Sequence, residues 1–159
     1  VYDGAMPSGN SVAMANLVRL TRLTGRSSFD DRADAVAAAF AADVARMPSA
    51  HTQLMAAVQS ASSPSLEVVI AGETAAPDTT ELLKVVRSRY LPQAVVLVVP
   101  DGTAGEQIRQ LAPFTENYAS IDGRAAAYVC RDFQCKLPTT DPAKLADLLD
   151  EATKAEPTS

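Results

Sequence analysis

Three short apolar runs dominate the pattern of hydrophobic and polar positions in the second half of the chain. They are residues 66–71 (LEVVIA), 94–99 (AVVLVV) and 125–130 (AAAYVC). Each run is short, apolar and nearly free of polar alternation, which is typical of strands buried on both faces. Segments with helical spacing lie between and after the runs. The alternation of strand and helix predicts an α/β fold with a small three-stranded, mainly parallel sheet, flanking helices and right-handed crossovers.

Capping signals mark where the helices of this part should begin. Asp78 followed by Glu81 has the pattern of a capping box, so a helix is expected from there to residue 90. Asp141 followed by Pro142 predicts the start of the last helix, and a shorter helix is expected over residues 106–112. Four valines of the sheet should be fully buried, namely Val69, Val96, Val98 and Val129.

The first part of the chain has helical spacing throughout. Helices are expected over residues 11–24, 28–46 and 49–61, with Gly25 and Pro48 ending the first two. The first helix is apolar except for a narrow polar stripe formed by Arg19, Arg22 and Arg26. The second has an Ala-rich reverse side, which either reflects helix propensity alone or forms a second packing face. A polar linker at residues 60–65 divides the chain into a helical segment, 1–63, and an α/β domain, 64–159.

Charge and composition narrow the function classes. The net charge is −5, and the excess of acidic residues lies entirely after residue 63, which argues against binding to nucleic acid or an anionic membrane. No apolar run approaches the roughly 18–20 residues of a membrane span. No signal peptide is visible, and Val1 reads as a position within a longer protein. Two cysteines are too few for a secreted disulfide scaffold, so a cytoplasmic location is expected.

The two cysteines are the first chemical candidates. Cys130 and Cys135 are separated by four residues, which matches neither a C-x-x-C redox motif nor a structural zinc site. On one straight strand they would be roughly 16 Å apart, so a bridge requires a sharp turn between them. Two unpaired thiols are the favoured interpretation, with a redox pair as the alternative. His51 is the single histidine and is expected to be a packing or surface residue, so no metal and no cofactor are predicted.

Two loop regions could bind small molecules. Asp3, Ser8 and Asn10 lie in a polar loop that could bind a sugar hydroxyl, although any loop before a helix needs such residues. The rim beyond the first two strands offers residues 72–74 and 101–103. It contains two acidic residues and no Gly-rich phosphate motif, so a nucleotide site is not expected.

Two stretches resemble a known family. Residues 2–11 (YDGAMPSGNS), followed by a Leu-rich helix ending in Thr24 and Gly25, resemble the last hairpin region of an α/α-toroid protein. Residues 126–149 (AAYVCRDFQCKLPTTDPAKLADLL) resemble the extreme carboxyl terminus of the YyaL-type, thioredoxin-domain-containing proteins. The spacing of the two stretches also fits, so the resemblance covers essentially the whole chain.

The resemblance implies a place within a larger protein. That family has an amino-terminal thioredoxin-like domain followed by a six-hairpin α/α toroid related to sugar epimerases and glycosidases. Residues 1–63 would then be the closing hairpin of the toroid, with Asp3, Ser8 and Asn10 towards its central funnel. The chain would be a structural or interaction portion that is not catalytic by itself, with the rest of its parent protein as partner and a homodimer as a possibility for the fragment. The alternative is a contribution to an enzyme, through the funnel residues for carbohydrate or through Cys130 and Cys135 for thiol exchange.

Overall fold

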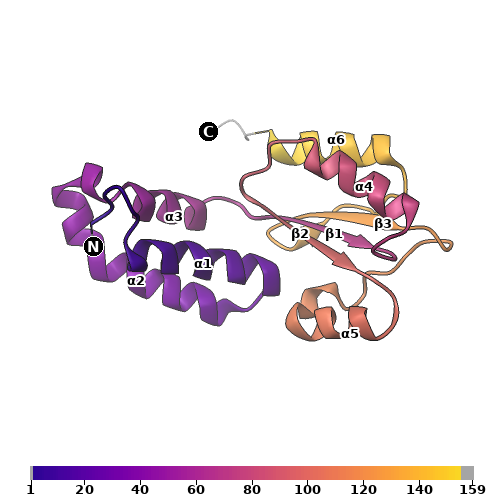
Figure 1. Ribbon diagram of the computed structural model, residues 1–159, viewed down its shortest axis with the longest axis horizontal. Helices are drawn as coiled ribbons and strands as arrows, with labels where there is room; N and C mark the ends of the chain where they lie inside the picture. The colour runs from indigo at the N-terminus through magenta and orange to yellow at the C-terminus, as the bar shows by residue number, and fades with distance from the viewer. Residues whose placement is uncertain (1, 155–159) are drawn as a thin grey trace. The chain divides into compact units, whose positions relative to one another are not determined.

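The computed structural model describes residues 2–154, and the chain divides into two compact units, residues 1–64 and 65–159 (Figure 1). The first unit is helical and the second is α/β. Among the described residues, no helix combines the length and apolar character that crossing a membrane requires.

Three helices and one short turn lie in the described part of the helical unit, residues 2–64. They are α1 (Gly9–Thr24), α2 (Ser27–Arg46), the 3-10 turn η1 (Pro48–Ala50) and α3 (Thr52–Ser62). Ser8 caps α1, because its hydroxyl oxygen accepts a hydrogen bond from the Ser11 amide at 3.2 Å. Gly25 ends α1 with φ 70°, in the left-handed region that favours glycine. α2 ends at Arg46, and Pro48 follows after one residue, Met47, as predicted.

Helix α1 is the centre of the helical unit. It packs against both α2 and α3, whereas α2 and α3 make few contacts with each other. The buried core consists of Met14, Val18, Ala33, Leu54 and Ala57. Within the 20 residues of α2, Ala33 is the single fully buried one. The unit is therefore an open layer of helices, and the Ala-rich side of α2 is exposed.

Arg22 corrects the prediction of a solvent-exposed arginine stripe on α1. Its side chain is only 7% exposed, and its guanidinium donates to the carbonyl oxygens of Ser60 and Ser63. These carbonyls lie at the carboxyl end of α3, where backbone oxygens lack helical partners and a cation is favoured. The periodicity located Arg22 on α1 but gave no information about the end of α3.

Within residues 65–154, the α/β unit has four strands, three helices and a 3-10 turn, η2 (Pro113–Thr115). The strands are β1 (Leu66–Ala71), β2 (Ala94–Val99), β3 (Ala126–Arg131) and β4 (Gln134–Cys135), and the helices are α4 (Pro77–Arg87), α5 (Gly102–Leu111) and α6 (Pro142–Thr153). The sheet has the order β2-β1-β3-β4. β1 pairs with β2 in parallel, whereas β3 is antiparallel to both β1 and β4.

The α/β class and the parallel pair were predicted correctly, but a mainly parallel sheet of three strands was wrong. Ala71 pairs with both Val99 and Ala126, so the connection from β2 to β3 begins and ends at the same end of the sheet. β3 must then run in the opposite direction. A run of apolar residues indicates burial on both faces, and that burial occurs for a central strand of either direction.

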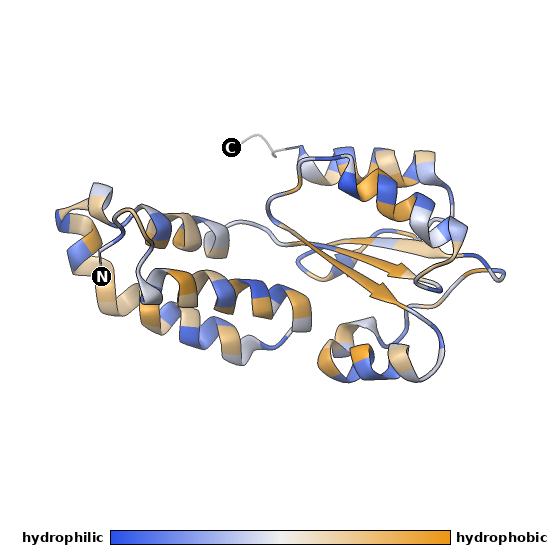
Figure 2. Cartoon of the chain, in the orientation of Figure 1, coloured by the Kyte–Doolittle hydropathy of each residue, from blue (hydrophilic) through white to orange (hydrophobic). Residues whose placement is uncertain are grey.

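Helices cover the sheet from two sides. α4 and α6 lie together on one face, and α5 lies on the other (Figure 1). Figure 2 shows that β2 is hydrophobic along its length and that β1 is mostly hydrophobic, whereas α4 and α6 carry both hydrophobic and hydrophilic residues. The core under α4 and α6 includes Val68, Ile70, Leu82, Val129 and Leu145. β1 lies between β2 and β3, and all six of its residues are buried.

The edge position of β2 overturns part of the predicted burial. Val69 and Val129 are 0% and 2% exposed, as expected, but Val96 is 39% exposed and Val98 is only half-buried. Val95, next to Val96 in the strand, is 2% exposed. An edge strand covered incompletely on one face keeps alternating burial, even where its sequence does not alternate.

Asp78 does not form the predicted capping box. The cap residue of α4 is Ala76, and the Asp78 carboxylate instead accepts hydrogen bonds from the amides of Thr79 at 2.9 Å and Ala125 at 2.7 Å. The hydrogen bond from Ala125, followed by that from Thr79, lowers the pKa of Asp78 below its ordinary value. Asp78 therefore ties the first turn of α4 to the residue that precedes β3.

Candidate functional site

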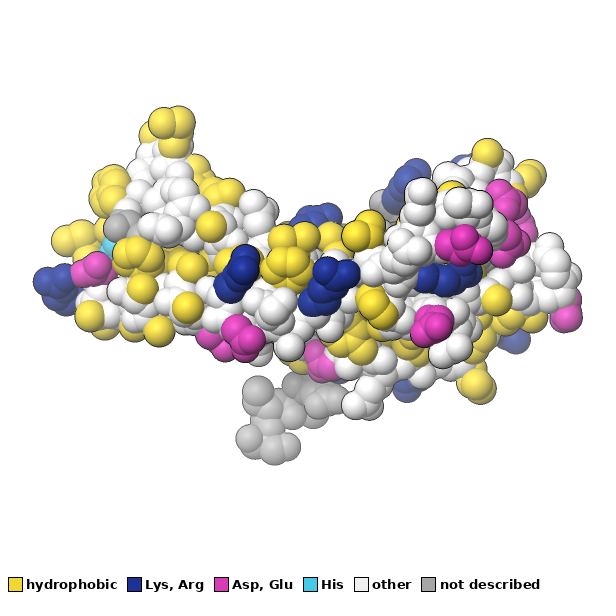
Figure 3. All heavy atoms as spheres, turned by 90° about the horizontal axis from the view of Figure 1, so that it is seen from below, with side chains coloured by type: hydrophobic (Ala, Val, Ile, Leu, Met, Phe, Trp, Pro, Cys, Tyr) yellow, Lys and Arg dark blue, Asp and Glu magenta, His cyan; other side chains and the backbone are white. Residues whose placement is uncertain are grey.

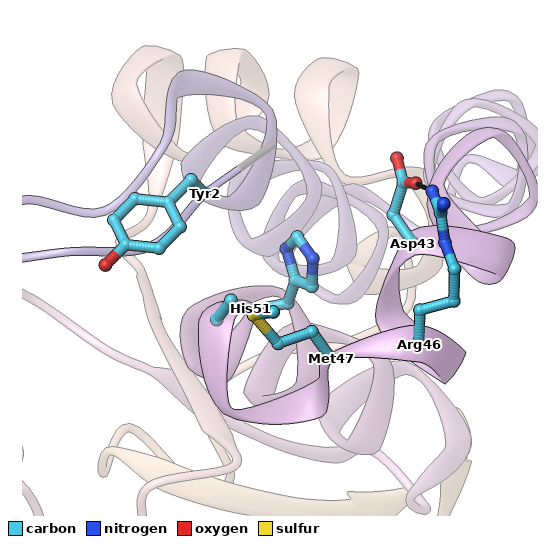
Figure 4. Close-up of a pocket in the computed structure, with 6 residues that line it drawn as sticks. Tyr2, Asp43, Arg46, Met47 and His51 are labelled. Carbon is cyan, nitrogen blue, oxygen red and sulfur yellow. Dashed lines mark hydrogen bonds and ion pairs between the residues drawn. The ribbon is translucent and has the colours of Figure 1, made fainter.

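A pocket of about 430 Å³ opens on the helical unit (Figure 4). It is lined by Tyr2, Asp43, Arg46, Met47, Ala50 and His51. His51 is 5% exposed, and its Nδ1 atom has no hydrogen-bond partner among the described residues. Figure 4 shows the Asp43 carboxylate beside the Arg46 guanidinium, with which it forms an ion pair, and not beside the His51 imidazole. The lining thus combines an ion pair, a buried imidazole and the exposed side chains of Tyr2 and Met47.

The Asp3 carboxylate lies inside the helical unit, where it holds the first loop in place. It accepts hydrogen bonds from the amides of Ser8 at 2.8 Å and Leu54 at 3.0 Å. Burial alone raises the pKa of Asp3, but hydrogen bonds from Ser8, Leu54, Ser11 and Gln53 together lower it below its ordinary value. Of the three residues considered for sugar binding, Asp3 is buried, Ser8 caps α1, and Asn10 is exposed in the first turn of α1. The Ser8 hydroxyl and the Asp3 carboxylate both contact the Ser11 hydroxyl, so these two candidates belong to one hydrogen-bonded group, whereas Asn10 is exposed.

Cys130 and Cys135 form a disulfide, with 3.8 Å between their Cα atoms. The favoured prediction of two unpaired thiols was therefore wrong. Asp132 and Phe133 make a two-residue turn with φ of 49° and 62°, which is the backbone of a type I′ hairpin. This sharp turn places Cys130 directly opposite Cys135. Asp132 suits the first position of such a turn, but Phe133 stands where Gly is usual, so the sequence carried only half of the turn signal.

Contacts around the hairpin explain how this turn is held. Asp132 accepts a hydrogen bond from the Ser65 amide at 2.8 Å, and the Phe133 amide donates to Glu67 Oε2 at 3.0 Å. The ring of Phe133 packs edge-on against Phe114 with 5.0 Å between centroids. These contacts offset the cost of positive φ at residues that are not glycine.

One row of paired residues runs across all four strands at the disulfide. Val95 pairs with Glu67, Glu67 with Cys130, and Cys130 with Cys135. Residues directly opposite one another in a sheet point to the same face. Glu67 and Cys130 are 0% and 1% exposed, whereas Cys135 is exposed. A buried carboxylate is thus the cross-strand neighbour of the buried cysteine.

Tyr118 contacts the disulfide from the segment after η2. Its hydroxyl oxygen is 2.6 Å from Cys135 Sγ and 3.7 Å from Cys130 Sγ. A disulfide sulfur carries no proton, so the phenol donates. The Tyr118 ring stacks on Tyr128, with 4.4 Å between centroids. Burial, followed by the nearby charge of Glu67 and by Tyr128, raises the pKa of Tyr118, which keeps the phenol protonated.

The rim beyond β1 and β2 offers little room for a ligand at Gly72. A Cβ atom at this residue would lie 2.7 Å from the Cβ of Ala125, so the chain before β3 already occupies that side. Among the described residues, no group of three His, Cys, Asp or Glu side chains is arranged to hold a metal ion.

Three residues of the disulfide site could not be predicted from the sequence. Glu67 lies inside the apolar run 66–71, and Tyr118 lies in residues 114–124, where no helix or strand was predicted. Tyr128 was read only as a strand residue. A single acidic residue inside a run expected to be buried on both faces was the available signal, because such a residue needs a specific partner.

The chain is homologous to a segment of a larger protein. Spermatogenesis-associated protein 20 of Rattus norvegicus is 35% identical over 149 residues, which cover 94% of this chain and 19% of that protein. The protein of the same name from Homo sapiens is 35% identical over 147 residues, covering 92% of this chain and 19% of that protein. The chain thus spans about a fifth of the length of these curated relatives. No family model and no solved structure matches it.

Proposed function

We propose that this chain is the carboxy-terminal structural and interaction portion of a larger protein of the YyaL type. Its helical unit closes an α/α toroid built by the preceding part of that protein. The observation that carries the proposal is the uneven coverage of the match, which takes in 94% of this chain but 19% of the relative. A segment retained almost whole inside a protein about five times as long needs surfaces that fit its neighbours.

The open layer of helices offers such a surface. Four apolar side chains of α1 and α3 are about two-fifths exposed, namely Val12 (41%), Leu20 (38%), Met55 (43%) and Val58 (37%). Hydrophobic side chains are spread widely over the face of the helical unit seen in Figure 3. The outer side of α2 is rich in alanine, which lets another helix approach closely. Further helices of the parent protein are the occupant that fits both features.

The polar loop supports this structural role more than a direct part in carbohydrate chemistry. The Asp3 carboxylate is engaged by two backbone amides, and Ser8 is engaged in capping α1. Hydrogen-bonding groups committed in this way have little capacity left for a sugar hydroxyl.

Methionine oxidation tests the proposal, because the four methionines of the chain all precede residue 56. Met47 and Met55 are 58% and 43% exposed, whereas Met14 is 1% exposed. In the isolated chain, dilute hydrogen peroxide should oxidise Met47 and Met55 at least ten times faster than Met14. In the full-length parent protein, the oxidation of Met55 should be several times slower than in the isolated chain. Mass spectrometry of tryptic peptides measures the oxidation rates.

Met14 serves as the internal control, since its burial within the helical unit is the same in either form. Equal oxidation rates for Met55 in the isolated chain and the parent protein would overturn the proposed docking of α3. Self-association of the isolated chain would also protect Met55 from oxidation, even without the parent protein. Light scattering of the isolated chain detects such self-association.

A further inference from the structure

The geometry points to Cys130–Cys135 as a redox-active pair that exchanges electrons with disulfides of polypeptide substrates and with dithiol reductants. The pair combines an exposed sulfur, a buried sulfur beside a carboxylate, and a phenol that donates to the exposed sulfur. A cross-link with only a structural role requires none of these neighbours. The inference rests on the α/β unit and is independent of the proposed function.

The exposure of the two sulfurs assigns their order of reaction. Cys135 is exposed on the two-residue strand β4, so a substrate sulfur can reach it. Cys130 is 1% exposed on β3 and can react only with a sulfur already brought to Cys135. Cys135 is therefore the sulfur that forms the mixed disulfide, and Cys130 is the sulfur that resolves it.

The exchange begins with both cysteines reduced. The Cys135 thiolate attacks one sulfur of the substrate disulfide, and the other substrate sulfur leaves as a thiolate. The Cys130 thiol gives its proton to Glu67, and its sulfur attacks Cys135 Sγ. The bond between Cys135 and the substrate breaks, and the second substrate sulfur leaves as a thiolate. The pair has lost two electrons and the substrate disulfide has gained them. A dithiol reductant then attacks Cys135, Cys130 leaves and takes back the proton from Glu67, and the reductant's second thiolate releases Cys135 and closes the reductant's own disulfide.

Glu67 is placed to accept the Cys130 proton. It is the cross-strand neighbour of Cys130, and both residues are buried away from water that could take the proton. Thiolate is the attacking form of a cysteine, so a resolving thiol in such a place requires a nearby base. The hydrogen bond from the Phe133 amide to Oε2 fixes the carboxylate beside the hairpin turn.

Tyr118 favours the thiolate of Cys135. A hydrogen bond from its hydroxyl to sulfur stabilises the charged form of the reduced cysteine and promotes its departure from a mixed disulfide. Tyr128 stacks on Tyr118, and Arg109 donates to the Tyr118 carbonyl oxygen at 3.3 Å. On β2, the cross-strand neighbour of Glu67 is Val95, which carries no charge.

Reduction of insulin by dithiothreitol tests the activity of the whole 159-residue chain. The chain should accelerate the appearance of insulin turbidity at pH 7 at least fivefold over dithiothreitol alone, and C130S and C135S should each abolish this acceleration. Acid quenching followed by mass spectrometry should detect a mixed disulfide with insulin in C130S and none in C135S.

The pH profile separates a proton-accepting Glu67 from a merely structural one. Resolution of the mixed disulfide should be about tenfold slower in E67Q at pH 7. Its rate in this variant should rise about tenfold per pH unit below the thiol pKa, because solvent must then remove the proton. The wild-type rate should rise much less. The matched control is E73Q, an exposed carboxylate beyond β1, which should behave as wild type.

Each measurement has an outcome that overturns the inference. If insulin turbidity appears no faster with the wild-type chain than with the C130S variant, the bridge is only a cross-link. A mixed disulfide trapped in C135S would reverse the assigned order of the sulfurs. An E67Q variant with the wild-type pH profile would remove Glu67 as the proton acceptor. If E67Q fails to fold by circular dichroism, the trapping experiment on C130S still tests the exchange activity.

Discussion

Asp3 is the residue through which the first loop of the chain is fixed to α3. Its carboxylate accepts from the amides of Ser8 and Leu54, and its own amide donates to the Ala50 carbonyl oxygen at 2.8 Å. The Leu54 amide belongs to the first turn of α3, where helical amides lack carbonyl partners. A buried acid next to a helix amino terminus thus has a structural explanation that needs no ligand.

Asp3→Ala should lower the free energy of unfolding of the helical unit by about 2 kcal/mol, because two partly buried amides lose their acceptor. Urea denaturation followed by circular dichroism measures the change. Asp34→Ala, on an exposed position of α2, is the control and should change stability little. Equal stability for the two variants would show that the Asp3 hydrogen bonds are readily replaced by water.

Asp78 makes the stability of the α/β unit depend on pH. Its folded-state pKa is lowered, first by the hydrogen bond from the Ala125 amide, so its contribution is present above the unfolded pKa of about 3.9. The contribution is lost as the pH falls through the lowered folded pKa. Asp78→Asn should therefore lower the melting temperature at pH 7 and flatten its decline below pH 4. Melting curves of both proteins from pH 7 to pH 2 test this, and parallel curves would contradict it.

At the level of the elements, local signals predicted position well and pairing poorly. The bounds of β1 and β2 were predicted correctly from their apolar runs, and Gly25 and Pro48 marked the ends of α1 and α2. The direction of β3 and the short strand β4 depend on long-range pairing and on a turn without glycine, so periodicity could not predict them. The disulfide followed from that turn. Glu67 and Tyr118 meet the cysteines only through the sheet register and the fold of the segment after η2.

The edge position of β2 gives a prediction within one strand. Val95→Asp should cost several kcal/mol, since an unpaired charge would enter the interior. Val96→Asp should cost less than about 1 kcal/mol, because this side chain is 39% exposed. The two variants differ by one position and carry the same new charge, so each is the control for the other. Similar losses in denaturant unfolding would place β2 inside the sheet.

At the scale of the whole molecule, the chain carries two separate cores and an uneven distribution of charge. The core of the helical unit and the core beneath α4 and α6 share no residue. Residues 1–63 carry five acidic and five basic residues, so the net charge of −5 belongs to the α/β unit. Net negative charge keeps copies of this unit apart in solution.

The outer edge of β2 then bears on how the protein behaves when it is concentrated. Its sequence, AVVLVV, has high β propensity, no charge and no proline, which is the composition of segments that stack into cross-β fibrils. Repulsion between copies vanishes near the isoelectric point of about 4.8, and strand-to-strand growth should be fastest there. Val96→Lys would place a charge on the exposed edge and should lengthen the lag before thioflavin fluorescence appears at that pH severalfold. An unchanged lag would show that fibril growth begins elsewhere, and the open edge would be harmless in the folded protein.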